Sequence, residues 1–236
     1  MENIDKICLI TGASSGIGYA IAKALREENY RLILTGRREK RLQELQSDNV
    51  DILAGDLIST DFQDNIENFI YEKYERCDYL FNCAGSLVVG SIDEIDLDKM
   101  ILMLRLNIES TFRLTYKFLK HFKKQGYGHI INISSILGTK VRPNAGVYAA
   151  TKFAIEALSE SLRMELAGTN IQVSCIEPGL VMTELHRDYE IHPKDSMKIH
   201  NPLTVENIVN TVKFIMNQPK HVRIPKLMIL PKDHNI

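Results

Sequence analysis

A phenol and an ammonium group lie one helical turn apart at Tyr148 and Lys152, a spacing that places both on one face of a helix. A free phenol has a pKa near 10, so about one molecule in a thousand is ionised at neutral pH. Lowering that pKa by about three units takes about 4 kcal/mol, which a lysine about 4 Å away supplies only in a partly desolvated site. The pair therefore predicts acid–base chemistry, in which the tyrosine protonates a developing alkoxide or deprotonates an alcohol.

The same Tyr-x-x-x-Lys spacing also occurs at Tyr19/Lys23 and Tyr116/Lys120. We interpret these two pairs as surface pairs on amphipathic helices. Tyr148 differs because an apolar strand ends at Ser134 and Ser135, thirteen residues upstream, and active groups of parallel sheets gather at the carboxyl ends of strands. A Ser135 hydroxyl there can hydrogen-bond the substrate oxygen beside the phenol.

A glycine-rich turn, TGASSGIG, joins the first apolar run to a helical stretch at residues 11–18. Such glycines permit a tight turn, close approach of a pyrophosphate and close helix–sheet packing. The following helix N-terminus offers free N–H groups to phosphates. The spacing is G-x-x-x-G-x-G rather than the standard G-x-G-x-x-G, and the alternative is a glycine-rich turn without a ligand.

The end of the second predicted strand indicates which dinucleotide binds. NAD sites place an acidic residue about 20 residues after the glycines, whereas here Gly36 is followed by Arg37 and Arg38. Guanidinium groups match a 2′-phosphate and stack on adenine. The cofactor is therefore predicted to be NADP; the alternative is a solvated charge run that opens the next helix.

Short apolar runs alternate with amphipathic stretches along the whole chain, which predicts a doubly wound, Rossmann-like parallel sheet with helices on both faces, in one domain over residues 1–236. Strands are expected near 7–10, 32–34, 50–53, 79–81, 129–133, 172–176 and 227–230, and helices near 17–25, 62–74, 97–124, 147–166 and 205–217. The polar segment 180–202 breaks this rhythm late in the chain. We interpret it as a substrate lid, with a floppy loop as the alternative.

The composition narrows the classes of partner. The 236 residues carry 29 basic and 30 acidic side chains and a net charge of −1, so no global positive field favours nucleic acid or an anionic membrane. No apolar run approaches a spanning helix, and the acidic N-terminus is neither a signal nor a transit peptide. Four scattered cysteines indicate reduced thiols in a cytoplasmic protein. The spacing of His186, His192 and His200 does not suit a helix-face metal site, so no metal is expected.

The chain resembles the short-chain dehydrogenase/reductase family over essentially its whole length. The resemblance is carried by several motifs in order: TGASSGIG at 11–18, NCAG at 82–85, Asn107, Ser135, Tyr148-x-x-x-Lys152, and Pro178-Gly179 followed by Thr183. One departure is Cys83, where the family usually has a second asparagine. A thiol cannot replace the hydrogen bonds of an amide, which puts in doubt the local bracing of the central sheet.

The resemblance implies a role for each matched residue. Tyr148 is the acid/base, Ser135 polarises the carbonyl, Lys152 holds the nicotinamide ribose and tunes the tyrosine, and Asn107 holds a water of a proton relay. Asp56 and Leu57 would contact adenine, residues 82–85 would line the groove, and residues 178, 179 and 183 would contact the nicotinamide end. The cofactor-binding set implied is Gly12, Ser14, Ser15, Gly16, Ile17, Gly18, Arg37, Arg38, Asp56, Leu57, Asn82, Ala84, Gly85, Tyr148, Lys152, Pro178, Gly179 and Thr183.

Three further residues and the C-terminal run bear on the choice of substrate. Arg142 lies between Ser135 and Tyr148 and would suit a carboxylate or sulfonate, or is an exposed loop arginine. His186 or Arg187 could contact substrate from the lid, although solvated surface is the alternative. The C-terminal run 218–231 resembles the branch of the family that oxidises 3-hydroxy acids.

We expect an NADP-dependent oxidoreductase of a small hydroxy or carbonyl compound, such as a 3-hydroxy acid or semialdehyde. The alternatives are a reductase of a bulkier ketone such as a steroid and, in a different class, a catalytically silent NADP-sensing or scaffold protein.

The stretch 97–124 carries more apolar residues than one core-facing stripe holds, and the helix over 148–166 shares this property. Pairing both helices with their copies would build a two-fold four-helix contact. A homodimer or homotetramer is therefore expected; the alternative is a long helix buried within one chain.

Overall fold

A computed structural model describes residues 6–187, 189 and 191–235. Seven parallel strands form one sheet in the order β3-β2-β1-β4-β5-β6-β7, which confirms the predicted doubly wound architecture. The strands are β1 (Ile7–Ile10), β2 (Arg31–Gly36), β3 (Val50–Ala54), β4 (Tyr79–Asn82), β5 (Tyr127–Ile133), β6 (Asn170–Pro178) and β7 (Lys226–Ile229). The order reverses between β1 and β4, and ligands of open α/β sheets bind at such a switch point.

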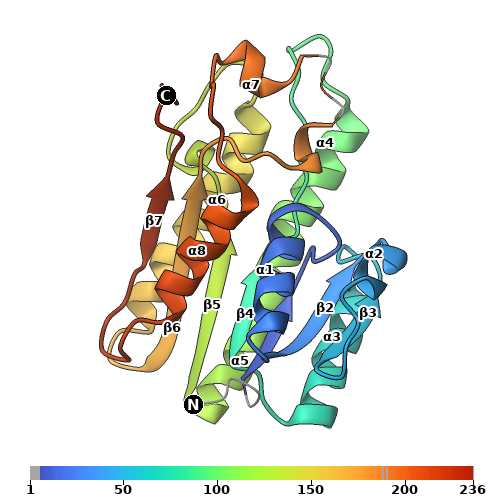
Figure 1. Cartoon of the computed structure of the whole chain (residues 1–236), viewed down its shortest axis with the longest axis vertical. Helices are drawn as coiled ribbons and strands as arrows, with labels where there is room; N and C mark the ends of the chain where they lie inside the picture. The colour runs from blue at the N-terminus through green and yellow to red at the C-terminus, as the bar shows by residue number, and fades with distance from the viewer. Residues whose placement is uncertain (1–5, 188, 190, 236) are drawn as a thin grey trace.

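Helices cover both faces of the sheet (Figure 1). One face carries α1 (Gly16–Glu27), α2 (Glu39–Gln43) and α8 (Val205–Met216), whose buried side chains share a core cluster that includes Ile21, Leu42 and Val212. The other carries α3 (Thr60–Tyr74), α5 (Thr111–Gln125) and α6 (Gly146–Glu165), with Ile66, Phe118 and Leu162 in a second cluster. Because both faces are covered, the central strands β1 and β2 carry unbroken runs of buried residues rather than an alternating pattern.

The predicted helix over 97–124 is not a uniform α-helix. It consists of α4 (Leu97–Leu104), a π-helical turn η2 (Arg105–Ser110) and α5. Asn107 is buried within η2. Single π-turns inside α-helices are frequent at functional sites.

The segment after β6 lies at the carboxyl edge of the sheet, where the chain also ends (Figure 1). It contains the short helices η4 (Glu184–His186) and α7 (Pro193–Ser196), which the sequence reading did not predict. Its base is closed by a bridge between Val181 and Leu203, with backbone hydrogen bonds from Met182 to Leu203 and from Leu203 to Leu180. The two ends of the segment are therefore held together by hydrogen bonds, and the residues between them lie over the carboxyl edge of the sheet.

Among the described residues, no helix combines the length and the apolar character that crossing a membrane would need.

Candidate active site

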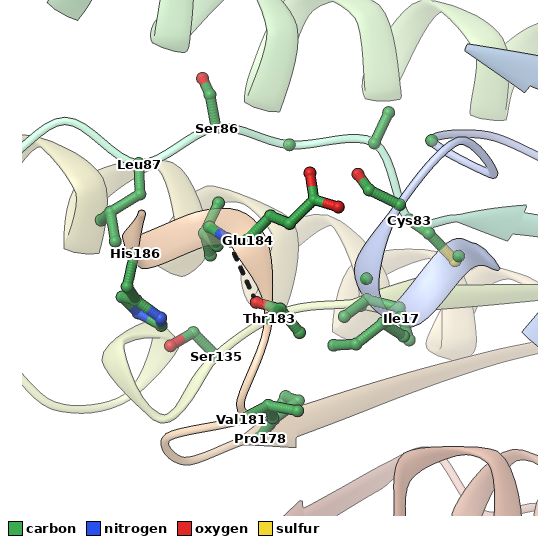
Figure 2. Close-up of a pocket in the computed structure, with 18 of the residues that line it drawn as sticks. Ile17, Cys83, Ser86, Leu87, Ser135, Pro178, Val181, Thr183, Glu184 and His186 are labelled. Carbon is green, nitrogen blue, oxygen red and sulfur yellow. Dashed lines mark hydrogen bonds between the residues drawn. The ribbon is translucent and has the colours of Figure 1, made fainter. Parts of the chain in front are cut away.

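A cavity of about 400 Å³ runs along the carboxyl edge of the sheet, within the usual size range of small-molecule sites. It begins at the β1–α1 turn and the basic residues after β2, and ends beside η3 (Ile136–Gly138) and the segment after β6. Figure 2 shows Ile17, Ser135 and His186 among the residues that line it. Of the residues predicted to bind cofactor or act in catalysis, all line it except Asn82 and Asn107. The strand ends thus bring together residues that are far apart in the sequence.

The glycine-rich turn is held tightly against the end of β4. Gly12 has a φ of +66°, and a Cβ there would lie 2.8 Å from the Cα of Ala84. The hydroxyl of Thr11 accepts hydrogen bonds from the backbone N–H groups of Cys83 (3.0 Å) and Ala84 (3.1 Å). The turn therefore needs glycine for its conformation and for its close packing, and it leaves the N-terminus of α1 facing the cavity.

The basic end of the cavity lies at the carboxyl end of β2. A Cβ at Gly36 would come within 2.9 Å of the Ser14 hydroxyl, so a side chain there would collide with the turn. Arg37 is exposed and lines the cavity. Arg38 donates a hydrogen bond from Nη2 to the carbonyl of Ser14 (3.0 Å). Two guanidinium groups thus border the same end, beside Asp56 and Leu57.

Tyr148 is buried in the first turn of α6. Burial raises the pKa of its phenol to about 12, while a hydrogen bond with the Ser135 hydroxyl and the positive charge of Arg142 act to lower it. Ser135 itself begins η3, where its side-chain oxygen accepts from the backbone N–H of Leu137 (3.1 Å). The predicted serine and tyrosine therefore lie in one cavity, and Arg142 adds a positive charge that acts on the phenol.

Lys152 lies one turn further along α6 and is buried. Its Nζ donates to the carbonyl of Ile133 (2.9 Å) and lies 5.8 Å from the centre of the Tyr148 ring. Burial lowers the pKa of this ammonium group to about 8. The strand end of β5 thus holds the lysine in place beside the phenol.

Asn82 and Asn107 line a second, small cavity of about 10 Å³, which Lys152 also borders. Asn107 donates to the carbonyl of Ser86 (3.0 Å) and to the hydroxyl of Thr151 (3.1 Å). A volume of this size suits one water molecule.

The central sheet is braced near this small cavity by a chain of side-chain hydrogen bonds. Asn82 donates to Asn132 (2.8 Å), and Asn132 donates to Ser159 (2.9 Å). The neighbouring Cys83 is bound through its backbone to Thr11. The bracing therefore passes through Asn82 and does not depend on the side chain at position 83.

The other two Tyr-x-x-x-Lys pairs lie away from both cavities. The Tyr19 hydroxyl donates to Glu44 (3.1 Å), and its ring lies under Arg41, 5.3 Å from the guanidinium carbon. Tyr116 is exposed on α5.

Several lining residues extend the predicted set. The cavity is lined by Arg142, His186 and Arg187, each of which the sequence places either against the substrate or on the exposed surface. It is also lined by Glu184 and His234, to which no sequence pattern assigns a role. His234 reaches the cavity because Gly179 has no side chain: a Cβ there would lie 2.6 Å from the His234 ring and 2.8 Å from Pro231. The polar C-terminal segment has no periodicity, so no sequence pattern indicated this contact.

Comparison with known proteins places these features in a family. A family model described as short chain dehydrogenase matches residues 6–193. An uncharacterized oxidoreductase of Staphylococcus aureus is 32% identical over 231 residues, covering 96% of this chain and 97% of the relative. One of Staphylococcus epidermidis is 31% identical over 230 residues, with the same coverage.

Solved structures agree. The closed form of a serine dehydrogenase complexed with NADP+ superposes with a TM-score of 0.88 at 30% identity, covering 94% of each chain. An alcohol dehydrogenase from the archaeon Thermococcus sibiricus, complexed with 5-hydroxy-NADP, gives a TM-score of 0.86 at 26% identity and covers 98% of each chain. With its glycine-rich turn, its parallel sheet and its buried tyrosine and lysine, this chain belongs to the short-chain dehydrogenases, a family of nicotinamide-dependent oxidoreductases.

Proposed function

We propose that the protein is an NADP(H)-dependent oxidoreductase that interconverts a small hydroxy compound and its carbonyl form. The observation that carries this proposal is the placement of Tyr148, Ser135 and Lys152 in the same cavity as the glycine-rich turn and the two arginines after β2. One continuous cavity can therefore hold a dinucleotide and bring its reactive end to an acid–base group.

The residues present fit such a cofactor. The first turn of α1 contains no acidic residue, so its free N–H groups and positive dipole end suit a pyrophosphate. Arg37 and Arg38 would hold a 2′-phosphate, and Asp56 and Leu57 would border the adenine. Pro178, Gly179 and Thr183 would hold the nicotinamide end. When bound, the cofactor supplies or accepts the hydride.

The side chains of the protein manage the proton. In the reducing direction, the Tyr148 hydroxyl gives its proton to the substrate oxygen, while Ser135 donates a hydrogen bond to that oxygen and polarises the carbonyl. Lys152 balances the phenolate that remains. A water in the small cavity beside Lys152 and Asn107 would connect this group to solvent and restore the proton. Oxidation runs through the same groups in reverse.

The substrate end of the cavity favours an anionic group, and we infer a 3-hydroxy acid or the corresponding semialdehyde acid. Arg142 provides a positive charge, and His186 and His234 line the same region. Burial lowers the pKa of His186 to about 4 and lowers that of His234 as well. Among the residues that the structure describes, ring nitrogens of both histidines are buried without a hydrogen-bond partner, so they remain available to a polar substrate.

The segment 180–202 is proposed to act as a lid. Its fastened base, described above, leaves the intervening residues to cover the cavity. Arg142, which lines the cavity, donates to the Met197 sulfur (3.0 Å) of that part. The backbone N–H of His200 donates to Asp233 (2.7 Å) in the C-terminal segment. Lids of this kind exclude water from the reacting groups.

The subunits are proposed to associate through the helices over 97–124 and 148–166. Large apolar side chains on these helices are exposed in the isolated chain: Leu97 (64% exposed), Ile101 (50%), Leu102 (51%), Tyr116 (48%), Phe153 (42%) and Met164 (57%). An exposed apolar surface of this kind is typical of an interface.

The proposal is tested by following NADPH absorbance with a panel of semialdehyde acids, 3-oxo acids, neutral aldehydes and a steroid ketone. We expect turnover with the small acids and weaker turnover with neutral compounds of the same length. Preference for the steroid would support the bulky-ketone alternative. Tight NADPH binding without turnover of any substrate would support a catalytically silent NADP-sensing protein.

A further inference from the structure

One carboxylate, that of Glu184, extends from η4 into the cavity, toward the side lined by Cys83 and Ser86 (Figure 2). Its oxygens contact three guanidinium groups: Arg38 at 2.6 Å, Arg187 at 3.8 Å and Arg41 at 3.9 Å. The hydrogen bond from Arg38 is the main reason that the pKa of Glu184 lies below its ordinary value, so this residue is a carboxylate at neutral pH.

Both terminal nitrogens of Arg38 already hold a partner in this arrangement. Its Nη1 donates to Glu184 (2.6 Å) and its Nη2 to the carbonyl of Ser14 (3.0 Å). A phosphate bound in the usual two-pronged manner would use two such N–H groups on one edge of the guanidinium. Carboxylate and phosphate recognise the same donors, so a 2′-phosphate that approached Nη1 of Arg38 would meet the negative charge of Glu184 already bound there.

The position of Glu184 along the chain connects this competition to the reacting end of the site. Glu184 directly follows Thr183, whose hydroxyl accepts from the backbone N–H of Leu185 (3.3 Å) and begins η4. The same short helix carries His186 into the substrate end of the cavity. The short helix η4 therefore carries both the carboxylate that contacts Arg38 and a side chain at the substrate end.

We propose that Glu184 is a specificity-determining residue for the cofactor, which occupies Arg38 in place of a 2′-phosphate and must be displaced when the phosphorylated dinucleotide binds. The proposal rests on the role of Arg38 in NADP(H) binding given above. A dinucleotide without the 2′-phosphate leaves the Arg38–Glu184 pair intact. Glu184 therefore lowers the selectivity for NADP(H) over NAD(H) below the value that the arginines alone would give.

The experiment compares two fragments that differ only by the 2′-phosphate: adenosine 2′,5′-bisphosphate and adenosine 5′-monophosphate. Neither fragment carries nicotinamide, so the catalytic end of the cavity does not contribute. Their Kd values are measured by calorimetry on the full chain and on Glu184→Gln. Because both side chains of the pair are partly exposed (38% and 44%), we expect the preference for the bisphosphate to rise about two- to fivefold in the variant.

Glu44→Gln is the matched control, because Glu44 pairs with Arg41 (3.2 Å) but does not line the cavity. This substitution removes one negative charge that lies beside the same arginines. We expect the preference for the bisphosphate to stay within twofold of that of the unaltered chain. In an Arg38→Gln background, Glu184→Gln should no longer change the preference, because the competed donor is gone.

Two results would overturn the proposal. If the unaltered chain prefers the bisphosphate and Glu184→Gln leaves that preference unchanged or lowers it, Glu184 does not compete, although the proposed NADP(H) preference stands. If the unaltered chain and Glu184→Gln both bind the two fragments equally, the arginines do not read the 2′-phosphate, and the cofactor preference fails together with this inference.

Discussion

The side-chain amide of Asn107 donates a hydrogen bond of 3.1 Å to the hydroxyl of Thr151, and that hydroxyl donates to the backbone carbonyl of Tyr148 (2.7 Å). The π-helical turn is thereby joined to the first turn of α6, between the proposed acid–base tyrosine and Lys152. Two helices from different parts of the chain therefore hold the proposed catalytic groups in one position, as preorganised chemistry requires.

Removal of the phenolic hydroxyl tests the proposed acid–base group. Tyr148→Phe keeps the ring and its packing, so NADPH binding should change little while kcat falls by at least about 100-fold. Tyr19→Phe and Tyr116→Phe serve as controls, since both tyrosines lie outside the cavities. Steady-state kinetics and cofactor titration decide; a similar loss of kcat in either control would contradict the assignment.

The arginine at the end of β2 should determine cofactor choice. Arg37→Ala should lower the preference for NADPH over NADH by about 10- to 100-fold, because charge-assisted contacts contribute about 1.5–3 kcal/mol. Lys40→Ala removes an exposed positive charge from α2 outside the cavity lining, and should leave the preference nearly unchanged. The measurement is kcat/KM with each cofactor; equal values in the unaltered protein would rule out an NADP(H) preference.

Arg142 should select the acidic group of the substrate. Arg142→Met keeps an apolar stem and removes the charge, so KM for a hydroxy acid should rise about 10-fold or more. The methyl ester of the same acid should show little change. Lys140→Met, an exposed position of the same segment outside the cavity lining, provides the control. An equal rise in KM for acid and ester would mean that Arg142 acts only on the shape of the cavity.

The same substitution should also move the pH profile of oxidation. The positive charge of Arg142 lowers the pKa of the Tyr148 phenol, so its removal raises that pKa. Oxidation needs the phenolate, and its rate therefore rises with pH through the pKa of this group. We expect the rising limb of kcat/KM for a neutral alcohol to shift to higher pH in Arg142→Met. A limb at the same pH in both proteins would contradict this coupling.

A buried histidine should make the fold sensitive to acid. Burial lowers the pKa of His129 to about 4, and its Nε2 lies 2.9 Å from the Ser174 hydroxyl. Between about pH 6.5 and 4, the unfolded chain binds a proton at this histidine and the folded chain does not. The free energy of unfolding therefore falls as the pH drops through this interval, by roughly 3 kcal/mol at most. His129→Gln should lose less stability over this interval. Urea unfolding at pH 7.5 and 4.5 measures the difference, and equal losses would exclude His129.

Association should depend on the exposed apolar face of α4. Ile101→Glu places a charge within it, and we expect the mass in solution to fall toward the 26.9 kDa of one chain. Ile92→Glu alters a side chain that is 97% exposed and lies outside these helices, and should leave the mass unchanged. Sedimentation at micromolar concentration distinguishes the results; an unaltered protein that sediments as a monomer would refute the proposed assembly.

The sequence alone predicted the sheet, its main covering helices and 18 of the 39 residues that line the cavity. Apolar runs such as residues 7–10 and 32–34 fall within observed strands, because parallel strands that are buried on both faces carry apolar side chains in unbroken runs. Several parts of the site are local motifs, and their neighbours in the sequence place them at the ends of strands or helices. These are the glycine-rich turn, the arginines after β2, Ser135, Tyr148 and Lys152.

Tertiary structure decided which separate segments meet. His234 reaches the cavity only because the segment after β7 packs on Gly179, and Glu184 meets Arg38 across 146 residues of sequence. Neither contact leaves a periodic or spacing signal, since each depends on the direction in which an irregular segment leaves the sheet. The π-turn at Asn107 is likewise fixed by hydrogen bonds to Ser86 and Thr151 on other elements, which local helix preference does not encode.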